Sequence, residues 1–302
     1  MTELPSVGVV VPTRDRPALL RATLAAIADQ DYPGPVTVLV VHDGSAPDHS
    51  VASDQVAVCA NTRTPGLAGA RNTGILALRT ELVAFCDDDD RWLPDKLRRQ
   101  VDLLAAHPQA PMVTCAIAVE FADTITARPA GTSTVTLAQL TRRRMAMLHS
   151  STFVFRRTAL TDGPPGLVAE DAPGSQNEDW DLLIRAARHT PIPHLDAPLV
   201  RVLWGQTSQF AHQYGSKVAA LRWMLDRHPE LRADRPGAAR VFGQLACWSA
   251  ATGDRHEAWR WTRQSLRHNW REPRAAIALA ALTGCVKVEQ VIGVLHRRGR
   301  GI

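Results

Sequence analysis

Short apolar runs alternate with polar loops through the first hundred residues. Apolar runs predict strands at 7–11, 36–41, 56–58 and 82–85, the last of them buried. Apolar residues at helical spacing predict helices over 18–28 and 68–78, the first with Asp15 as N-cap and Pro17 at its first position. Strands that alternate with helices predict an α/β fold, a doubly wound and mostly parallel sheet.

The fourth strand runs directly into four aspartates, Asp87 to Asp90. Adjacent carboxylates repel one another, and burying an unpaired one is costly. A divalent cation removes much of that cost, and oxygen ligands suit Mg²⁺ or Mn²⁺. The alternative is a solvated acidic turn that caps the next helix, near Pro94.

Three strand ends bring polar loops to one edge of this sheet, at 12–15, 42–45 and 87–90. Ligands of open α/β sheets bind outside the carboxyl ends of the strands. The loops contain no G-x-G-x-x-G and no Walker pattern, which disfavours a dinucleotide enzyme or a P-loop NTPase. The remaining interpretation is a nucleotide site built from carboxylates, a cation and an arginine.

The later part of the chain changes from mixed to helical character. Further predicted elements are strands at 111–118, 149–157 and 198–203, a loop or hairpin at 124–136, and a Gly/Pro-rich candidate lid at 161–175. Helical segments follow at 218–225, 241–251, 256–268, 275–282 and 286–295. The chain therefore predicts an α/β domain with a C-terminal α-helical extension.

Composition narrows the class of partner and the compartment. The net charge of +5 is modest and weighted toward the C-terminal part, which favours a phosphate-bearing ligand or an anionic membrane over nucleic acid. Five widely spaced cysteines form no disulfide framework or zinc pattern, so we expect a reducing compartment. A signal-peptide pattern is not seen, and the apolar run at 275–282 is too short to span a bilayer. We expect a cytoplasmic protein, with peripheral contact at the inner face of the membrane as an alternative.

Four blocks carry a resemblance to a known family. The stretches at 9–16, 40–45, 70–74 and 85–97 resemble, in order and spacing, the nucleotide-sugar half of family 2 glycosyltransferases, which have the Rossmann-like GT-A fold. The resemblance covers roughly the first two thirds of the chain. It implies a catalytic domain over 1–208, with a nucleotide-sugar half over about 1–110 and an acceptor half over about 111–208. Residues 209–302 then form a helical domain.

The resemblance also implies roles on the donor side. Pro12 and Thr13 lie against the base and ribose, with Arg14 beside them, and His42 or Asp43 contacts the base. Arg71 approaches the diphosphate, Asp87 and Asp88 bind the nucleotide sugar, with Asp88 on the ribose, and Asp89 holds the metal ion, with Asp90 adjacent. The family usually has Asp where His42 stands, although a neutral imidazole also accepts a hydrogen bond. A solvated helix position is the alternative for Arg71.

A second acidic centre lies at Glu178 and Asp179. Alone, it indicates the N-terminus of a helix, where acidic residues are favoured. The resemblance makes Asp179 the catalytic base and Glu178 its neighbour in the acceptor site. A base takes the proton of an acceptor hydroxyl or thiol, and a cation neutralises the leaving diphosphate. Direct displacement of this kind inverts the anomeric centre. Trp204, where relatives often have histidine, is either a sugar platform or a core residue.

The leading hypothesis is thus an inverting glycosyltransferase that uses Mn²⁺ or Mg²⁺ and a UDP- or GDP-sugar. The acceptor stays open between a saccharide, a lipid-linked sugar, a peptide and a natural product. A catalytically weak relative that binds a nucleotide sugar or a partner is one alternative. A nucleotidylyltransferase is another, disfavoured because its glycine-rich basic N-terminal loop is missing. Four roles stay open for the C-terminal helices. They bind the acceptor, form a homodimer, contact a membrane through their basic end, or only pack on the catalytic domain.

Overall fold

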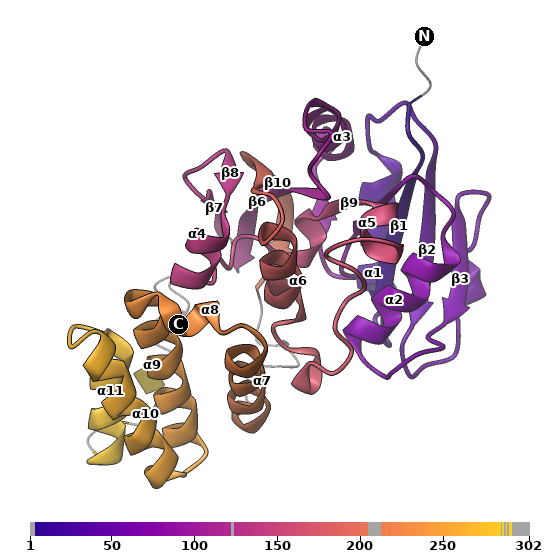
Figure 1. Cartoon of the computed structure of the whole chain (residues 1–302). Helices are drawn as coiled ribbons and strands as arrows, with labels where there is room; N and C mark the ends of the chain where they lie inside the picture. The colour runs from indigo at the N-terminus through magenta and orange to yellow at the C-terminus, as the bar shows by residue number, and fades with distance from the viewer. Residues whose placement is uncertain are drawn as a thin grey trace. The chain divides into compact units, whose positions relative to one another are not determined.

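The described chain consists of two compact units. The computed structural model describes residues 4–121, 124–204 and 213–284, together with positions 286, 288, 290 and 291. The sheet unit comprises Met1–Leu137, Met145–Asp171 and Glu178–Gln206. The helical unit comprises Ala138–Arg144, Ala172–Asn177 and Thr207–Ile302. Two short segments inside the predicted catalytic region thus group with the helices that follow it (Figure 1).

The sheet unit is built on a mixed ten-stranded sheet of order β3-β2-β1-β4-β9-β6-β10-β5, with β7 beside β6 and β8 beside β10. Its strands are β1 (Val7–Thr13), β2 (Val36–His42), β3 (Val56–Ala60), β4 (Leu82–Phe85), β5 (Arg91–Trp92), β6 (Met112–Phe121), β7 (Thr124–Arg128), β8 (Thr134–Val135), β9 (Val154–Arg156) and β10 (Ile192–Leu203). Its helices are α1 (Pro17–Ala28), α2 (Leu67–Ala77), α3 (Lys96–Ala106), α5 (Arg157–Thr161) and α6 (Glu178–Ala187), with short 3₁₀ turns η1 (His49–Val51) and η2 (Ser150–Thr152).

The predicted N-terminal strands are confirmed. All seven residues of β1 are buried, as expected of a strand covered on both faces. Strand β1 pairs in parallel with β2 on one side and with β4 on the other, and β3 continues the parallel arrangement beside β2. The carboxyl ends of β1, β2 and β4 therefore meet at one edge.

The first helix begins as predicted, but its cap differs. Pro17 is the first residue of α1, and Leu20, Thr23 and Ile27 supply its buried face. The prediction of Asp15 as N-cap is wrong, because Arg16 occupies that position and no side chain caps the helix. Asp15 instead adopts a left-handed conformation, with φ of 54°, in the turn that leads to α1.

Helix α2 packs very closely on the first strand. A Cβ atom at Gly74 would lie 2.4 Å from Val10 Cγ1, and one at Gly69 would lie 1.8 Å from the carbonyl oxygen of Thr64. Neither position has room for a side chain, so the helix backbone reaches β1 and the preceding turn directly. This close approach buries the residues between the two glycines, among them Arg71.

The stretch at 149–157 is only partly the predicted strand. Residues Ser150–Thr152 form η2, β9 covers Val154–Arg156, and α5 begins at Arg157. Strand β9 pairs antiparallel with β4, with Ala84 opposite Val154. A strand antiparallel to β4 begins where β4 ends, so η2 and His149 lie beside the aspartates.

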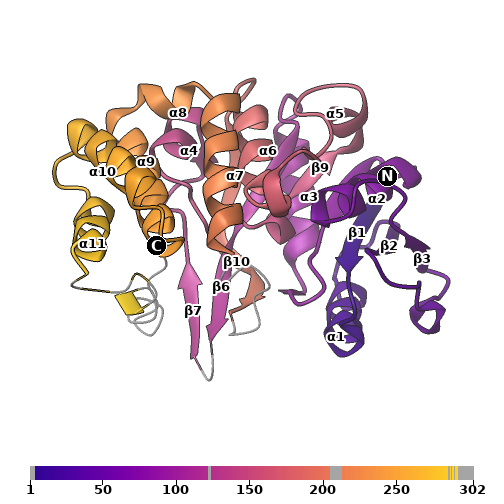
Figure 2. The same ribbon diagram turned by 90° about the horizontal axis from the view of Figure 1, so that it is seen from below.

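The second half of the sheet contains longer elements than the sequence predicts. Strand β6 pairs antiparallel with β7, seen in Figure 2, so the first part of the predicted loop or hairpin at 124–136 is a strand of the sheet. Strand β10 begins at Ile192 rather than at the predicted position 198. Its pairing with β6 shifts register between Leu195 and Pro198 and again before Val200. These irregularities interrupt the alternation of apolar and polar residues, so the sequence pattern indicates only the second half of the strand.

The helical unit contains α4 (Leu137–Arg142), η3 (Pro173–Ser175), α7 (Tyr214–Arg227), α8 (Glu230–Ala233), α9 (Arg235–Ala251), α10 (Arg255–His268) and α11 (Pro273–Leu282). The predicted helices from 218 to 282 are confirmed within α7, α9, α10 and α11. Most of the predicted helix at 286–295 lies outside the described residues. Among described helices, none combines the length and apolar character that crossing a bilayer requires.

Candidate active site

Loops after three parallel strands are in direct contact at the acidic edge. The backbone N–H of Asp43 donates to the carbonyl oxygen of Thr13 at 2.9 Å. The Thr13 hydroxyl in turn donates to Asp88 Oδ2 at 2.7 Å. Thr13, Asp43 and Asp88 are all buried. The structure therefore brings together three of the residues predicted to bind the donor.

The residues predicted to read the base are already held by their own loops. The His42 Nε2 atom accepts from the backbone N–H of Asp48 at 3.2 Å, and its Nδ1 atom lies 3.4 Å from the Ser45 hydroxyl. Burial lowers the pKa of His42, despite the opposing effect of Asp48, so the ring is neutral at pH 7. Base recognition by His42 stays a prediction.

Asp43 organises the turn that opens α2. Its carboxylate accepts from the backbone N–H of Gly66 at 3.0 Å and from the Asn61 side chain at 2.8 Å. Pro12 is buried in β1 opposite Val41 of β2, whereas Arg14 is exposed. No contact in the structure tests the predicted donor roles of these two residues.

The four aspartates form a tight turn and not a solvated run. The backbone N–H of Asp90 donates to the carbonyl oxygen of Asp87 at 3.1 Å. The buried Thr23 hydroxyl lies 2.9 Å from the carbonyl oxygens of both Asp88 and Asp90. Helix α1 thus holds the backbone of the turn, so the side chains can be held close to one another.

Asp88 and Asp89 share one cation. The Arg16 Nη1 atom lies 3.2 Å from Asp88 Oδ1 and 2.7 Å from Asp89 Oδ2. Burial raises the pKa of Asp88, and burial with the neighbouring aspartates raises that of Asp89 to about 7. Arg16 opposes both effects without cancelling them. The site therefore favours additional positive charge at this point, which is consistent with the predicted metal role of Asp89 but does not test it.

Arg71 joins the two acidic centres. Its guanidinium donates to Asp87 Oδ1 and to Glu178 Oε1, each at 2.7 Å, and to the Ser150 hydroxyl at 3.0 Å. The side chain is 2% exposed, so the predicted alternative of a solvated helix residue is wrong. Its predicted contact with the diphosphate stays a prediction.

The charges of this buried ion pair network are unevenly balanced. Burial raises the pKa of Asp87, but Arg71 and His149 lower it by more, so the carboxyl titrates below its ordinary range. Burial and the nearby Asp179 raise the pKa of Glu178 to about 7, against the opposing effect of Arg71. One guanidinium thus stabilises Asp87 as the anion more fully than it stabilises Glu178.

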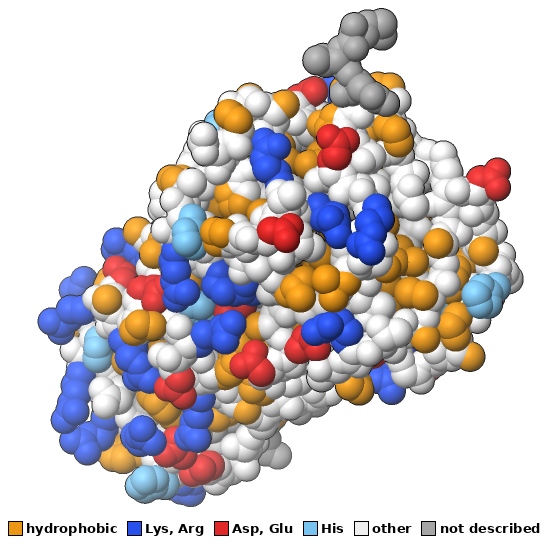
Figure 3. All heavy atoms as spheres, turned by 45° about the vertical axis from the view of Figure 1, so that its right-hand side comes forward, with side chains coloured by type: hydrophobic (Ala, Val, Ile, Leu, Met, Phe, Trp, Pro, Cys, Tyr) orange, Lys and Arg blue, Asp and Glu red, His pale blue; other side chains and the backbone are white. Residues whose placement is uncertain are grey.

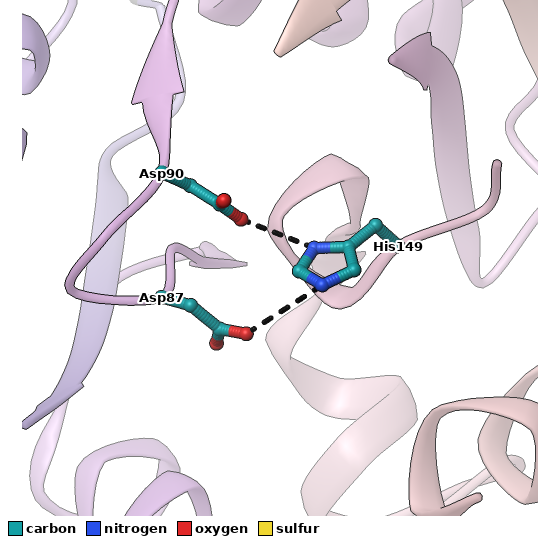
Figure 4. A group of neighbouring side chains, drawn as sticks. All are labelled: Asp87, Asp90 and His149. Carbon is teal, nitrogen blue, oxygen red and sulfur yellow. Dashed lines mark ion pairs between the residues drawn. The ribbon is translucent and has the colours of Figure 1, made fainter. Parts of the chain in front are cut away.

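A group with metal-ligand spacing lies at the same edge. Among the residues that the structure describes, Asp87, Asp90 and His149 each present one ligand atom, and these atoms lie within 4.8 Å of one another. Figure 4 shows the His149 ring between the two carboxylates, with Nδ1 3.1 Å from Asp90 and Nε2 3.9 Å from Asp87. Burial lowers the pKa of His149, but Asp90, Asp87 and Asp179 raise it to about 9 overall.

These residues fit a divalent cation. Asp90 Oδ1 is buried and accepts no hydrogen bond from any described residue, which is unusual for a buried carboxylate oxygen. The raised pKa of His149 indicates that the cluster favours positive charge between its carboxylates. Two carboxylates and one imidazole form a donor set that Mn²⁺ accepts.

Sequence reasoning missed the segment that supports this group. Ser151 is fully buried, and its hydroxyl donates to Asp90 Oδ2 at 2.5 Å and accepts from the backbone N–H of Asp87 at 2.9 Å. The Ser151 carbonyl oxygen accepts from the Trp92 indole at 3.0 Å. The polar run that precedes the apolar Phe153 signalled a strand start, but only antiparallel pairing with β4 puts it beside the aspartates.

The second acidic centre begins α6, as predicted. Glu178 is buried and paired with Arg71, whereas Asp179 is partly exposed and its Oδ1 accepts from the backbone N–H of Trp180 at 2.7 Å. Asp179 contributes to the raised pKa values of both Glu178 and His149, so it lies near both. The structure therefore brings the predicted base close to the predicted donor side.

Comparison with known proteins agrees with this arrangement. Residues 8–163 match the sequence profile of the family described as glycosyl transferase family 2. A curated relative, the UDP-Glc:alpha-D-GlcNAc-diphosphoundecaprenol beta-1,3-glucosyltransferase WfgD of Escherichia coli, is 25% identical over 104 residues, which cover 32% of this chain and 40% of that protein. The alignments with the first curated relatives cover 36%, 10% and 40% of their lengths.

Two solved structures share the fold. Residues 1–349 of TarS from S. aureus, in complex with UDP-GlcNAc, superpose with a TM-score of 0.62 at 14% identity, covering 98% of this chain and 92% of that one. The mannosyltransferase PcManGT from Pyrobaculum calidifontis, in complex with GDP-Man and Mn²⁺, gives a TM-score of 0.52 at 20% identity over 97% of this chain and 80% of that one.

The profile match covers more than half of the chain. It runs from β1 through α5 and includes the loops of the acidic edge, the buried Arg71 and the η2 segment. The chain therefore belongs to glycosyl transferase family 2.

Proposed function

We propose that this protein transfers a sugar from a nucleoside diphosphate sugar to an acceptor hydroxyl or thiol, with inversion at the anomeric carbon. The observation that carries this proposal is the Arg71 network, because one buried cation ties Asp87 on the donor side to Glu178 on the acceptor side. A single rigid group thus fixes the separation of the two centres that direct displacement requires.

In this reaction Asp179 acts as the general base. As the acceptor oxygen or sulfur attacks the anomeric carbon, its proton passes to the Asp179 carboxylate. The bond from the anomeric carbon to the diphosphate oxygen breaks, and its electron pair leaves with the nucleoside diphosphate. Attack from the face opposite the leaving group inverts the configuration, and no covalent enzyme intermediate forms.

Asp87, Asp90 and His149 are proposed to hold a divalent cation, with Asp89 beside them. When bound, the ion neutralises the charge that develops on the leaving diphosphate. The imidazole nitrogen favours Mn²⁺ over Mg²⁺, which prefers an all-oxygen shell. Ser151 and Thr23 hold the turn that carries these ligands.

Donor binding is assigned to the loops at the ends of β1, β2 and β4. Asp88 binds the ribose, and Pro12, Thr13, Arg14, His42 and Asp43 surround the nucleoside. The TarS complex contains UDP-GlcNAc and the PcManGT complex contains GDP-Man, so UDP- and GDP-sugars are the donors to test first. We propose a catalytic domain at 1–208 and a helical domain at 209–302. The segments Ala138–Arg144 and Ala172–Asn177 pack with the helical domain.

Release of nucleoside diphosphate tests the proposal. The protein is incubated with UDP- and GDP-sugars, Mn²⁺ and a panel of acceptors, and free UDP or GDP is measured. We expect release that EDTA abolishes and that Asp179→Asn lowers by at least about 100-fold, because a base contributes 10²–10⁴ in rate. Donor affinity of Asp179→Asn, measured by calorimetry, stays unchanged. Asp162→Asn, at an exposed aspartate, is the matched control and retains full turnover.

A second candidate function is donor binding without catalysis. The observation that favours it is His42, whose two ring nitrogens are already engaged by Ser45 and the Asp48 backbone. Tight binding of a nucleotide sugar with no release in any acceptor background, and no difference between wild type and Asp179→Asn, supports this alternative and contradicts the enzyme proposal.

A further inference from the structure

One face of α10 combines arginines with an exposed tryptophan. His256, Trp259, Arg260, Arg263 and Arg267 are all exposed and recur at helical spacing on a single stripe. The opposite face packs into the helical unit through Ala258, Trp261, Thr262 and Ser265. The outward stripe contains no acidic residue.

The single acidic residue inside α10, Glu257, borders this stripe and neutralises Arg260, one of its members. Glu257 accepts from the Trp261 indole at 2.9 Å and pairs with Arg222 and with Arg260. These partners lower the pKa of Glu257 against the opposing effect of burial. Glu257 therefore leaves Arg263 and Arg267 without a neutralising neighbour on their own helix.

A second tryptophan extends the surface beyond the end of α10. Trp270 is 72% exposed and Trp259 is 50% exposed, and these are the most exposed tryptophans in the described chain. The Arg271 guanidinium lies 4.6 Å from the centre of the Trp270 ring. A cationic group stacked on an exposed indole gives an element that is apolar on one side and charged on the other.

Charge is distributed very unequally along the chain. Residues 207–302 contain sixteen Lys and Arg against seven Asp and Glu, a formal charge of +9, whereas residues 1–206 carry −4. Figure 3 shows Lys and Arg side chains crowded on the part of the molecule at its lower left, which is the helical unit. The part of the chain at 207–302 therefore attracts anionic surfaces more strongly than residues 1–206 do.

We propose that the stripe of α10, with Trp270 and Arg271, docks the protein on the surface of an anionic lipid bilayer. Tryptophan favours the boundary between headgroups and acyl chains, and arginine pairs with lipid phosphates. A basic amphipathic helix face with exposed aromatic residues is the arrangement that binds in the plane of such an interface. A long nucleic acid fits less well, because the sheet unit of the same chain is net negative.

This surface also bears on the acceptor, and that step rests on the proposed function. The relative WfgD is named for a diphosphoundecaprenol-linked acceptor, a sugar carried on a lipid. A transferase that docks on the bilayer meets such an acceptor at high local concentration. The docking itself requires no catalysis, so the two proposals fail independently.

Vesicle sedimentation with the full chain tests the docking surface. Wild-type protein is mixed with vesicles of phosphatidylcholine alone or with one third phosphatidylglycerol. We expect binding only to the anionic vesicles, weakened by salt. Replacing Arg260, Arg263 and Arg267 by Gln lowers the partition coefficient by about 100-fold, since each arginine near an anionic surface contributes about five-fold. The control triple variant Arg21→Gln, Arg79→Gln and Arg98→Gln changes the same charge at exposed positions of the sheet unit and binds like wild type.

A second variant reports on the tryptophans. Trp259→Ala with Trp270→Ala retains salt-sensitive attraction but binds the anionic vesicles more weakly than wild type at every salt concentration. Circular dichroism and thermal melting confirm that each variant is folded. The proposal is overturned if wild type ignores anionic vesicles or if control and test triple variants lose binding equally. It is also overturned if a DNA duplex binds as tightly and independently of the tryptophans, or if the stripe variants instead dissociate a dimer in sedimentation.

Discussion

Replacing Arg71 by Met should destabilise the protein strongly and in a pH-dependent way. Methionine retains much of the buried volume but leaves Asp87 and Glu178 without their shared cation. At charge separations of about 4 Å and an effective dielectric constant of about 20, each pair contributes about 4 kcal/mol. Removal of the guanidinium also removes its own desolvation cost of several kcal/mol. The net loss in the free energy of unfolding is therefore about 3–5 kcal/mol.

The pH dependence follows from the two carboxyl groups. Arg71 lowers the pKa of both, so its removal raises both, and the pKa of Glu178 is already about 7 in the wild type. A group whose pKa is raised in the folded state stabilises it only at low pH and loses that contribution as pH rises. We therefore expect the variant to be less impaired at pH 5 than at pH 8.

Urea unfolding followed by circular dichroism measures this effect at both pH values. Arg98→Met is the matched control, because Arg98 pairs with Asp31 at an exposed position and its loss should change stability little at either pH. A loss below about 1 kcal/mol for Arg71→Met at both pH values would refute the view that the network stabilises the site.

Three further predictions concern other buried or paired groups. Ser151→Ala should weaken Mn²⁺ binding about 10-fold or more in a calorimetric titration, because Ser151 orients Asp90, and a Ser151→Thr variant should recover part of the loss. Lys96 is fully buried against the Trp92 ring, and burial lowers its pKa to about 8. The free energy of unfolding of the wild type should therefore rise between pH 8 and 10.5. Lys96→Met should abolish that rise and should be more stable than the wild type at pH 7 in urea unfolding. Burial raises the pKa of Glu170, but hydrogen bonds from Asn72, Thr64 and Arg63 lower it to about 2. Glu170→Gln should therefore be less stable than the wild type at neutral pH, and it should not show the fall in stability that the wild type shows between pH 4.5 and 2 in an acid titration.

The parallel half of the fold could be predicted because burial on both faces leaves a plain signal. Strand β1 is apolar at nearly every position, and the aspartates mark where β4 ends. Parallel pairing then requires that the carboxyl ends meet, so the shared edge was predicted, whereas the bond between Thr13 and Asp88 at that edge comes from the structure. The resemblance supplied the roles, while periodicity supplied the geometry.

The rest of the site depends on pairing that no local pattern reveals. His149 reaches Asp90 only because β9 inserts antiparallel between β4 and β6. Arg71 reaches Glu178 across 107 positions of sequence, and only the glycine-mediated approach of α2 to β1 buries it there. Both are tertiary contacts, so residue type and spacing could suggest each side chain but not its partner.

The interlaced course of the chain limits how the protein can be divided. Segments Ala138–Arg144 and Ala172–Asn177 belong with the helices, although the sequence before and after each of them belongs to the sheet unit. A Cβ atom at Gly237 in α9 would lie 2.3 Å from the carbonyl oxygen of Thr141, so the segment Ala138–Arg144 packs directly against the backbone of α9. A truncation after residue 208 would strip both segments of their packing partners, so neither half is a ready module for expression or for grafting onto another enzyme.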